Sequence, residues 1–197
     1  MIKNWLKIFI YQLKQNKLFS ALNVIGLSIG IAGLIFAILY WNEEHSYNDW
    51  NPEKEVVYQV ISDVGEKNIW PTNTSALEPY LKEMNPKVAE YCYLNVWYLS
   101  DLIENNGKKE YFEKIVDAQA NFFSFFPFDF IYGSAQSALK DESSIALSED
   151  AAQRLFGSEN PLGKEVTYGD KKLAVRGVYR ITGKSSMQPD AVTSLIA

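Results

Sequence analysis

Residues 18–42 limit how this chain folds more than any other feature, because none of them is charged and most are strongly apolar. An α-helix rises about 1.5 Å per residue, so roughly 20 apolar residues cross the hydrocarbon core of a bilayer. The run from Leu18 to Trp41 meets that length, contains no proline and stops at the Glu43-Glu44 pair. A soluble helix that is apolar on all sides at this length is unusual. The sequence therefore predicts a transmembrane helix over residues 18–42.

The charges on either side of this helix predict its orientation. The chain before it holds four lysines and no acid, namely Lys3, Lys7, Lys14 and Lys17. The chain after it begins with acids, namely Glu43, Glu44, Asp49 and Glu53. Because basic flanks stay in the cytoplasm, we expect the N-terminus inside and residues 43–197 outside. A cleaved signal peptide fits poorly, since the apolar run is too long and no A-x-A-like site follows it.

Residues 1–17 have the pattern of a basic amphipathic helix. Their apolar side chains recur at helical spacing over three turns, at Ile2, Trp5, Leu6, Phe9, Ile10 and Leu13. Lysines occupy much of the remainder, which is typical of a helix that lies in the membrane interface. The alternative is a plain cytoplasmic extension of the transmembrane helix.

Small residues line one side of the predicted transmembrane helix. Gly26 and Gly30 form a G-x-x-x-G motif, with Gly33 and Ala37 close to the same face. Small residues let another helix approach closely, so these four positions predict a helix-packing site. Plain exposure to lipid is the alternative.

Charge and cysteine content exclude some functions. The net charge is −5, and because the first 17 residues contribute +4, the remainder carries −9. Nucleic acid is therefore not expected as a partner, since phosphate binding needs clustered basic residues. Cys92 is the only cysteine, so no internal disulfide forms, and its apolar neighbours predict a packing role.

After residue 42 the chain alternates between strand-like and helix-like segments. β-Branched and aromatic residues predict strands over residues 55–63, 88–99, 111–118, 144–147, 166–168 and 172–179. A helix is expected over residues 76–84, capped by Asn73-Thr74-Ser75 and ending near Asn85-Pro86. Turn residues predict hairpins at Asn105-Asn106-Gly107 and Gly169-Asp170. We expect an α+β fold: an N-terminal amphipathic helix and one transmembrane helix, then a mixed α/β extracytoplasmic domain.

A phenylalanine-rich segment has two possible roles. Its six phenylalanines are Phe122, Phe123, Phe125, Phe126, Phe128 and Phe130. They form either part of the core or an exposed apolar lip for a partner. Since large exposed apolar patches are rare, we favour the core.

The segment after the strand at 144–147 carries clear helix signals. Ser148 is placed to cap a short helix, with Glu149 and Asp150 in the first turn, where the helix dipole favours acids. Leu155 and Phe156 precede Gly157, which ends the helix. Pro161-Leu162-Gly163 is a predicted turn, and Lys164 follows it.

The sequence offers no catalytic or cofactor motif. It has no G-x-x-x-x-G-K-S/T P-loop, no H-E-x-x-H and no Cys/His metal spacing. His45, the sole histidine, adjoins the predicted membrane helix and is poorly placed for a catalytic triad. We therefore expect no enzyme activity, cofactor or metal.

Several segments, in this order, resemble the N-terminal part of a MacB-like, FtsX-type ABC transporter permease. They are LFSALNVIGLSIGIAGLI, EEHSYNDWNPEKEVVYQV, DAQANFFSFFPFDFIYG, SSIALSEDAAQRLFGSENPLGKEV and LAVRGVYR. The most specific piece runs from Ile145 to Val166, and it contains Ser148, Leu155, Phe156, Gly157, Pro161, Gly163 and Lys164.

The resemblance implies a permease in the bacterial inner membrane, with residues 43–197 as an incomplete MacB-like periplasmic core domain. It implies a cytoplasmic ATPase partner, a second permease copy and ATP-driven export, with an adaptor or outer-membrane channel in some members. Complete members return to the membrane, whereas nothing after Asn42 is apolar enough to span it. We therefore expect an N-terminal fragment or truncated product that does not transport alone. The alternative is a single-pass anchored module that binds a partner or ligand outside the membrane.

Overall fold

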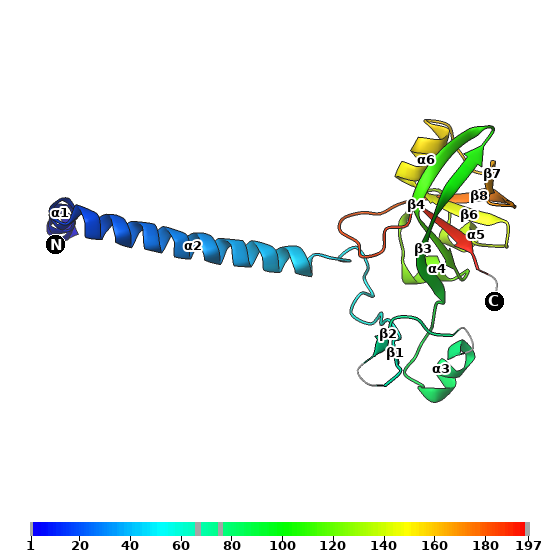
Figure 1. The fold of residues 1–197 in the computed structure, drawn as a ribbon, viewed down its shortest axis with the longest axis horizontal. Helices are drawn as coiled ribbons and strands as arrows, with labels where there is room; N and C mark the ends of the chain where they lie inside the picture. Colours follow the sequence, from blue (N-terminus) through cyan, green and yellow to red (C-terminus); the bar gives the residue numbers. More distant parts are fainter. Residues whose placement is uncertain (1, 66–67, 75–76, 196–197) are drawn as a thin grey trace. The chain divides into compact units, whose positions relative to one another are not determined.

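The structure is a computed structural model that describes residues 2–65, 68–74 and 77–195. The chain divides into two compact units, residues 1–47 and residues 48–197. We call them the helical unit and the β-rich unit. Figure 1 draws the elements of both units in sequence colours.

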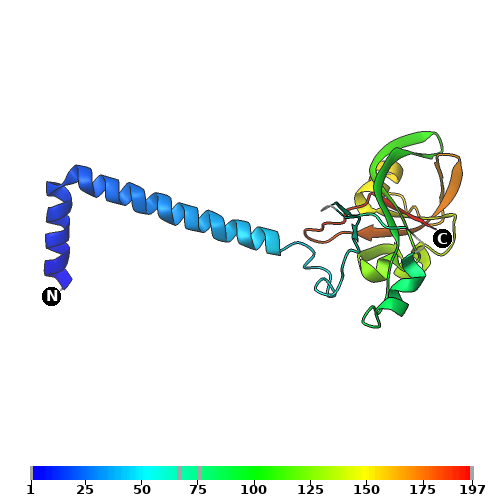
Figure 2. The same cartoon turned by 60° about the horizontal axis from the view of Figure 1, so that its bottom comes forward.

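The helical unit consists of α1 (Ile2–Gln15) and α2 (Lys17–His45). The backbone leaves the helical region at Asn16, which has a φ of −112°, and Figure 2 shows α1 turned away from the axis of α2. The first segment is therefore a separate helix, although its place in a membrane interface stays a prediction. Within the described residues, α2 alone is long and apolar enough to cross a membrane. None of its residues is buried in this chain.

The β-rich unit is built on a mixed sheet. Among the described residues, seven strands pair in the order β5-β8-β6-β9-β4-β3-β7. They are β3 (Leu94–Asn105), β4 (Lys108–Ala118), β5 (Asp129–Gly133), β6 (Ser144–Ser148), β7 (Glu165–Tyr168), β8 (Lys171–Arg180) and β9 (Ala191–Ser194). Pairs β4–β9 and β6–β8 are parallel, and the other pairs are antiparallel. Since β7 also pairs with β8, the strands of this sheet other than β5 close into a ring.

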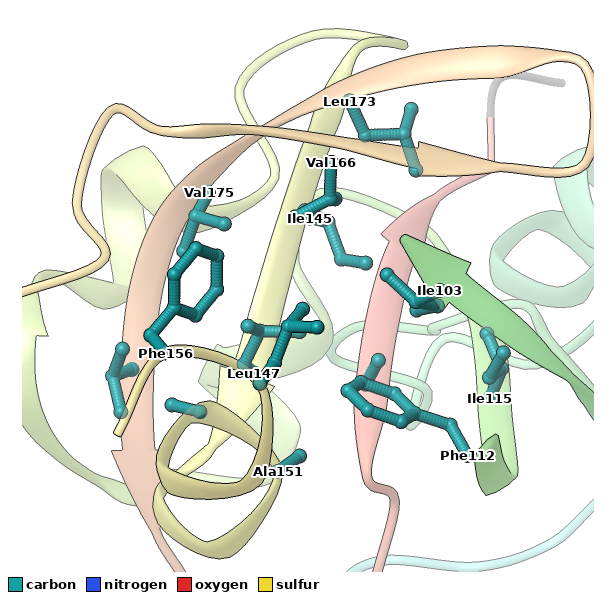
Figure 3. Packing of buried hydrophobic residues seen from close by; sticks show 14 residues of the cluster. Ile103, Phe112, Ile115, Ile145, Leu147, Ala151, Phe156, Val166, Leu173 and Val175 are labelled. Atoms are coloured by element: carbon teal, nitrogen blue, oxygen red, sulfur yellow. The ribbon is translucent and has the colours of Figure 1, made fainter. Parts of the chain in front are cut away.

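The central strands are buried on both faces. Successive side chains of a strand point to opposite faces, so each central strand contributes to two clusters. Ile145 and Leu147 of β6 belong to the first cluster and Ala146 to the second. Helix α6 (Glu149–Phe156) covers the first cluster, and Figure 3 shows Ala151 and Phe156 beside Leu147. This double burial explains why Ile145, Ala146 and Leu147 form a continuous apolar run.

The phenylalanine-rich segment belongs to the second cluster. Phe122, Phe123 and Phe128 are buried, and the other three phenylalanines are half-buried. Phe126 and Phe130 pack against the buried three, so five of the six phenylalanines support the interpretation as core, and Cys92 packs half-buried against the same cluster. The segment folds into α4 (Phe122–Phe125) and β5, followed by α5 (Ala135–Ala138), three elements that the sequence did not predict.

Both predicted hairpins are present. Asn105 pairs with Lys108, so Asn106 and Gly107 form a two-residue turn with φ angles of 50° and 83°. A type I′ hairpin turn needs positive φ at both central residues, which asparagine and glycine tolerate. The second hairpin joins β7 to β8 through Gly169-Asp170.

The predicted strand over residues 55–63 is wrong. Only its end forms a strand, β1 (Ser62–Asp63), which pairs with β2 (Ile69–Trp70). Val56 and Tyr58 are 63% and 81% exposed, so their β-forming side chains pack on no neighbouring strand. Strand propensity depends on such packing, and without it the pattern does not fix the conformation.

Two other boundaries differ from the prediction. The predicted strand over 88–99 begins only at Leu94 and continues to Asn105. Helix α3 (Glu78–Met84) begins later than predicted and ends before Asn85, as expected. The predicted cap at Ser75 and the helix start at Ala76 lie outside the described residues.

Candidate functional site

We call residues 48–53 the strap. They follow the end of α2 in the chain and are bound to the rest of the β-rich unit. At the outer end of the strap, Asn48 has a φ of 60°, a left-handed conformation that asparagine tolerates better than most residues. Its backbone N–H donates to the carbonyl oxygen of Lys184 over 2.8 Å. Its side-chain amide donates to Ser186 Oγ over 3.0 Å and accepts from the Ser186 N–H over 2.9 Å. One residue thus holds the strap to two positions of the loop between β8 and β9.

The inner end of the strap is buried. Asn51 is 5% exposed, and its side-chain amide donates to the carbonyl oxygen of Phe125 over 2.9 Å. Its Oδ1 accepts from the N–H of Glu53 over 2.9 Å. The Trp50 ring lies 4.7 Å from the Phe128 ring, so the strap joins the second hydrophobic cluster. This end is fixed by burial as well as by hydrogen bonds.

The β8–β9 loop (residues 181–190) connects the strap with β4, β6 and α6. Near its end, the Asp190 carboxylate accepts from the backbone N–H of Glu113 over 2.9 Å and pairs with Arg154 over 3.0 Å. The carbonyl oxygen of Asp190 accepts from the N–H of Ser148 over 2.8 Å. The loop therefore contacts the strap at one end and β4, β6 and α6 at the other.

The helix signals around Ser148 have structural roles. The Ser148 hydroxyl accepts from the N–H of Ala151 over 3.2 Å, as an N-cap does, and Glu149 and Asp150 fill the first turn. Leu155 and Phe156 point into the first cluster. Gly157 ends the helix with a φ of 66°. The predicted cap, first turn and helix end are thus all present.

The turn after Gly157 is fixed against β8. Pro161 is buried, and its carbonyl oxygen accepts from the N–H of Lys164 over 3.0 Å. Gly163, at a φ of 79°, donates to the carbonyl oxygen of Val175 over 2.7 Å. The Lys164 ammonium lies 5.3 Å from the centre of the Phe156 ring, a cation–π contact. These residues shape the unit and offer no catalytic arrangement.

The predicted helix-packing residues are all exposed in the described part of the helical unit. Gly26, Gly30 and Gly33 of α2 are exposed, and a Cβ added at any of them has no atom within 4 Å. Ala37 is exposed as well. Contact with a neighbouring helix stays a prediction.

One hollow of about 620 Å³ lies beside the β7–β8 turn and the end of β9. Asp101, Asp117 and Tyr168 line it, and burial followed by the two carboxylates raises the pKa of the Tyr168 phenol. Thr193 donates to Asp117 there. The lining includes no histidine or cysteine, and the described residues hold no cluster of three or more potential metal ligands.

The sequence model of a family described as the MacB-like periplasmic core domain matches residues 20–196. The chain belongs to the MacB-like periplasmic core domain family. The β-rich unit is accordingly the periplasmic-type domain of an ABC transporter permease family, as the resemblance predicted. No curated protein matches the chain.

Three solved structures are similar to parts of this MacB-like chain. A domain of a protein described as a permease, from Porphyromonas gingivalis, is 24% identical, with 53% of this chain and 50% of that chain covered and a TM-score of 0.45. The periplasmic region of MacB from Actinobacillus actinomycetemcomitans is 16% identical, with 57% and 52% covered and a TM-score of 0.43. The extracellular domain of the noncanonic ABC-type transporter YknZ from Gram-positive bacteria is 17% identical, with 62% of each chain covered and a TM-score of 0.47. This chain thus spans between 50% and 62% of the length of those chains.

Sequence reasoning did not identify the strap of this MacB-like domain. The stretch from Asn48 to Pro52 is rich in turn formers and lies shortly after the predicted membrane helix. This local pattern was the signal available in the sequence. Its partners Lys184 and Ser186 lie more than 130 positions further along the chain, where no local pattern marks them.

Proposed function

We propose that this chain is the permease segment of an ABC transporter that works in export from the bacterial inner membrane. In this proposal α2 crosses the membrane, and the β-rich unit relays an ATP-driven conformational change on the periplasmic side. The family match supports the proposal, because it begins inside α2 and ends at residue 196. The apolar helix and the β-rich unit therefore belong to a single family segment, and the strap is the covalent route between them.

The proposal requires partners. The sequence has no P-loop, so ATP hydrolysis comes from a separate cytoplasmic ATPase. A second permease copy supplies the neighbour that the small residues of α2 favour. The lysines of α1 favour the cytoplasmic interface of the bilayer, where anionic lipids gather. A periplasmic adaptor or outer-membrane channel completes the export path in some family members.

Orientation is tested by labelling introduced cysteines in intact spheroplasts with an impermeant thiol reagent. The variants are Asn16→Cys and Glu55→Cys in a Cys92→Ser background, and the Glu55 side chain is 86% exposed. We expect labelling at 55 and none at 16 until the cells are opened. Labelling at 16 alone would reverse the orientation and contradict the proposal.

Coupling is tested with purified protein. The chain alone should neither bind nor hydrolyse ATP, and intrinsic hydrolysis would overturn the proposal. A full-length permease that contains this segment should change the turnover of the ATPase encoded beside it. Unchanged turnover would favour the anchored interaction module instead.

One observation favours that second function. Large apolar side chains are exposed along the segment before β3, namely Val56, Tyr58, Val60, Ile61, Val64, Ile69, Trp70, Tyr80 and Met84. No described residue between 52 and 93 is buried, so this segment has no core of its own. Exposed apolar surface of this kind marks contact with another protein or segment.

A further inference from the structure

The two ends of the strap are held with different strength. Asn48 and its partner Ser186 meet through hydrogen bonds that are exposed to solvent. Water competes for such bonds, so each contributes little net free energy. The left-handed backbone of Asn48 adds a cost that a released strap no longer carries.

Asn51, in contrast, stays attached. Breaking its bond to the Phe125 carbonyl leaves polar groups unpaired at a site that is 5% exposed. That cost exceeds the loss of a solvent-exposed bond. The contact between the Trp50 and Phe128 rings adds apolar burial at the same end.

These attachments follow one another along the chain. A pull on the backbone at Tyr47 reaches Asn48 first and reaches Asn51 only after the chain between them has straightened. We propose that the contact of Asn48 with Lys184 and Ser186 is a releasable latch, and that Asn51 is the fixed point behind it. This inference rests on the proposed function, since it takes the movement to arrive from α2.

When movement arrives from α2, the latch is the first contact of the β-rich unit that changes. Opening it removes the contacts of Asn48 with Lys184 and Ser186, while the buried Ser185, the packed Met187 and the ties of Asp190 to β4 and α6 stay in place. Asn48 is thus a positioning residue for this loop. A closed latch holds this part of the loop against the strap, and an open one ends that coupling.

Amide hydrogen exchange tests the latch. It is measured on the full-length permease that contains this chain, reconstituted with its ATPase in nanodiscs. The Ser186 N–H reports the latch because it donates to Asn48, and the Glu53 N–H reports the fixed point because it donates to Asn51. We expect ATP to accelerate exchange at Ser186 roughly three- to tenfold, as loss of one exposed hydrogen bond predicts, with Glu53 unchanged.

Two variants separate the latch from a general loosening. Asn48→Gly accepts the left-handed backbone but lacks the side-chain amide, so Ser186 should exchange rapidly with or without ATP. The pair Asn48→Cys and Ser186→Cys, in a Cys92→Ser background, is read at the neighbouring Met187 N–H, which donates to Ser185 Oγ. Exchange there should not respond to ATP when the pair is oxidised and should become fast when it is reduced. Asn48→Cys alone is the control for oxidation.

Each outcome either supports the latch or contradicts it. If ATP changes exchange elsewhere in the β-rich unit but not at Ser186, or if the oxidised pair responds like the native protein, the latch is wrong and the proposed function stands. If ATP changes exchange nowhere in the β-rich unit, the proposed function and the latch fail together. A response at Ser186 that Asn48→Gly makes independent of ATP supports the latch.

Discussion

The Tyr179 hydroxyl donates a hydrogen bond to the carbonyl oxygen of Pro189 over 2.8 Å inside the β-rich unit. Tyr179 is wholly buried, and this burial raises the pKa of its phenol well above the ordinary value, so the hydroxyl keeps its proton. The bond positions the β8–β9 loop immediately before Asp190, on which the ties to β4 and α6 depend.

Removing that hydroxyl should destabilise the β-rich unit. In Tyr179→Phe the buried carbonyl of Pro189 loses its partner, and we expect a loss of about 1–3 kcal/mol in unfolding free energy. Circular dichroism of the full chain in detergent, followed through the β-sheet transition, measures it. Tyr58→Phe is the matched control, because Tyr58 is 81% exposed and its change should stay within about 0.5 kcal/mol. Equal losses of stability in Tyr179→Phe and Tyr58→Phe would contradict a stabilising role for the bond between Tyr179 and Pro189.

The cap of α6 gives a second stability prediction. Ser148→Ala leaves the N–H of Ala151 without its acceptor and should cost about 1 kcal/mol. Ser148→Asp should retain most of the stability, since aspartate caps as well as serine does. Ser158→Ala, at an exposed position past the helix end, serves as the control for loss of a hydroxyl. The same melting experiment ranks the stability of the three variants. If Ser148→Ala is as stable as the native protein, Ser148 has no capping role.

The pairing of Glu149 with Arg180 predicts a dependence on pH. Two hydrogen bonds at 2.6 and 2.7 Å from the Arg180 guanidinium hold the pKa of the Glu149 carboxyl below its ordinary value of about 4.3. A depressed pKa in the folded state means that the carboxylate stabilises the fold above the unfolded pKa. The contribution is lost as pH falls through the folded pKa.

Melting the native protein and Glu149→Gln across a pH series checks this sign. The native protein should be the more stable of the two at pH 7, by a small margin because the pair is partly exposed. The difference should shrink below about pH 4 and vanish at lower pH. A stability difference between the two proteins that grows on acidification would contradict the prediction. High salt should reduce the margin at pH 7 as well.

The small residues of α2 predict association in the membrane. Gly30→Ile places a branched side chain where a neighbouring helix would approach, and should weaken association of α2 by on the order of 1–2 kcal/mol. Ser28→Ile makes a similar increase in size on the opposite side of the helix and is the matched control. In-membrane association of the isolated α2 segment is measured by energy transfer. Equal association of the native and Gly30→Ile segments would favour plain lipid exposure.

Signals that act over a few residues were read correctly from the sequence. The Ser148 cap, the stop at Gly157 and the turn at Asn106-Gly107 each depend on contacts or backbone angles within one turn of chain. The length and apolar composition of α2 are likewise properties of one segment, and they predicted the helix within three residues at its end.

Features that depend on distant partners were not predicted. The strand expected over residues 55–63 has suitable residues, but among the described residues only Ser62 and Asp63 pair with a neighbouring strand. In contrast, β9 has only four residues and is defined by its ladders to β4 and β6. The strap depends on a contact between Asn48 and Ser186, which are 138 positions apart. A pattern in one segment carries no information about such a pairing.

The closure of the sheet through β7 has a mechanical consequence. Because β7 is bonded to both β3 and β8, parting of any one ladder leaves the strands of the ring joined through the others, and dividing the ring in two requires a second ladder to part. We therefore expect displacement that arrives at Asn51 to move the ring as one body. The travel of any point on the unit should then grow with its distance from the strap.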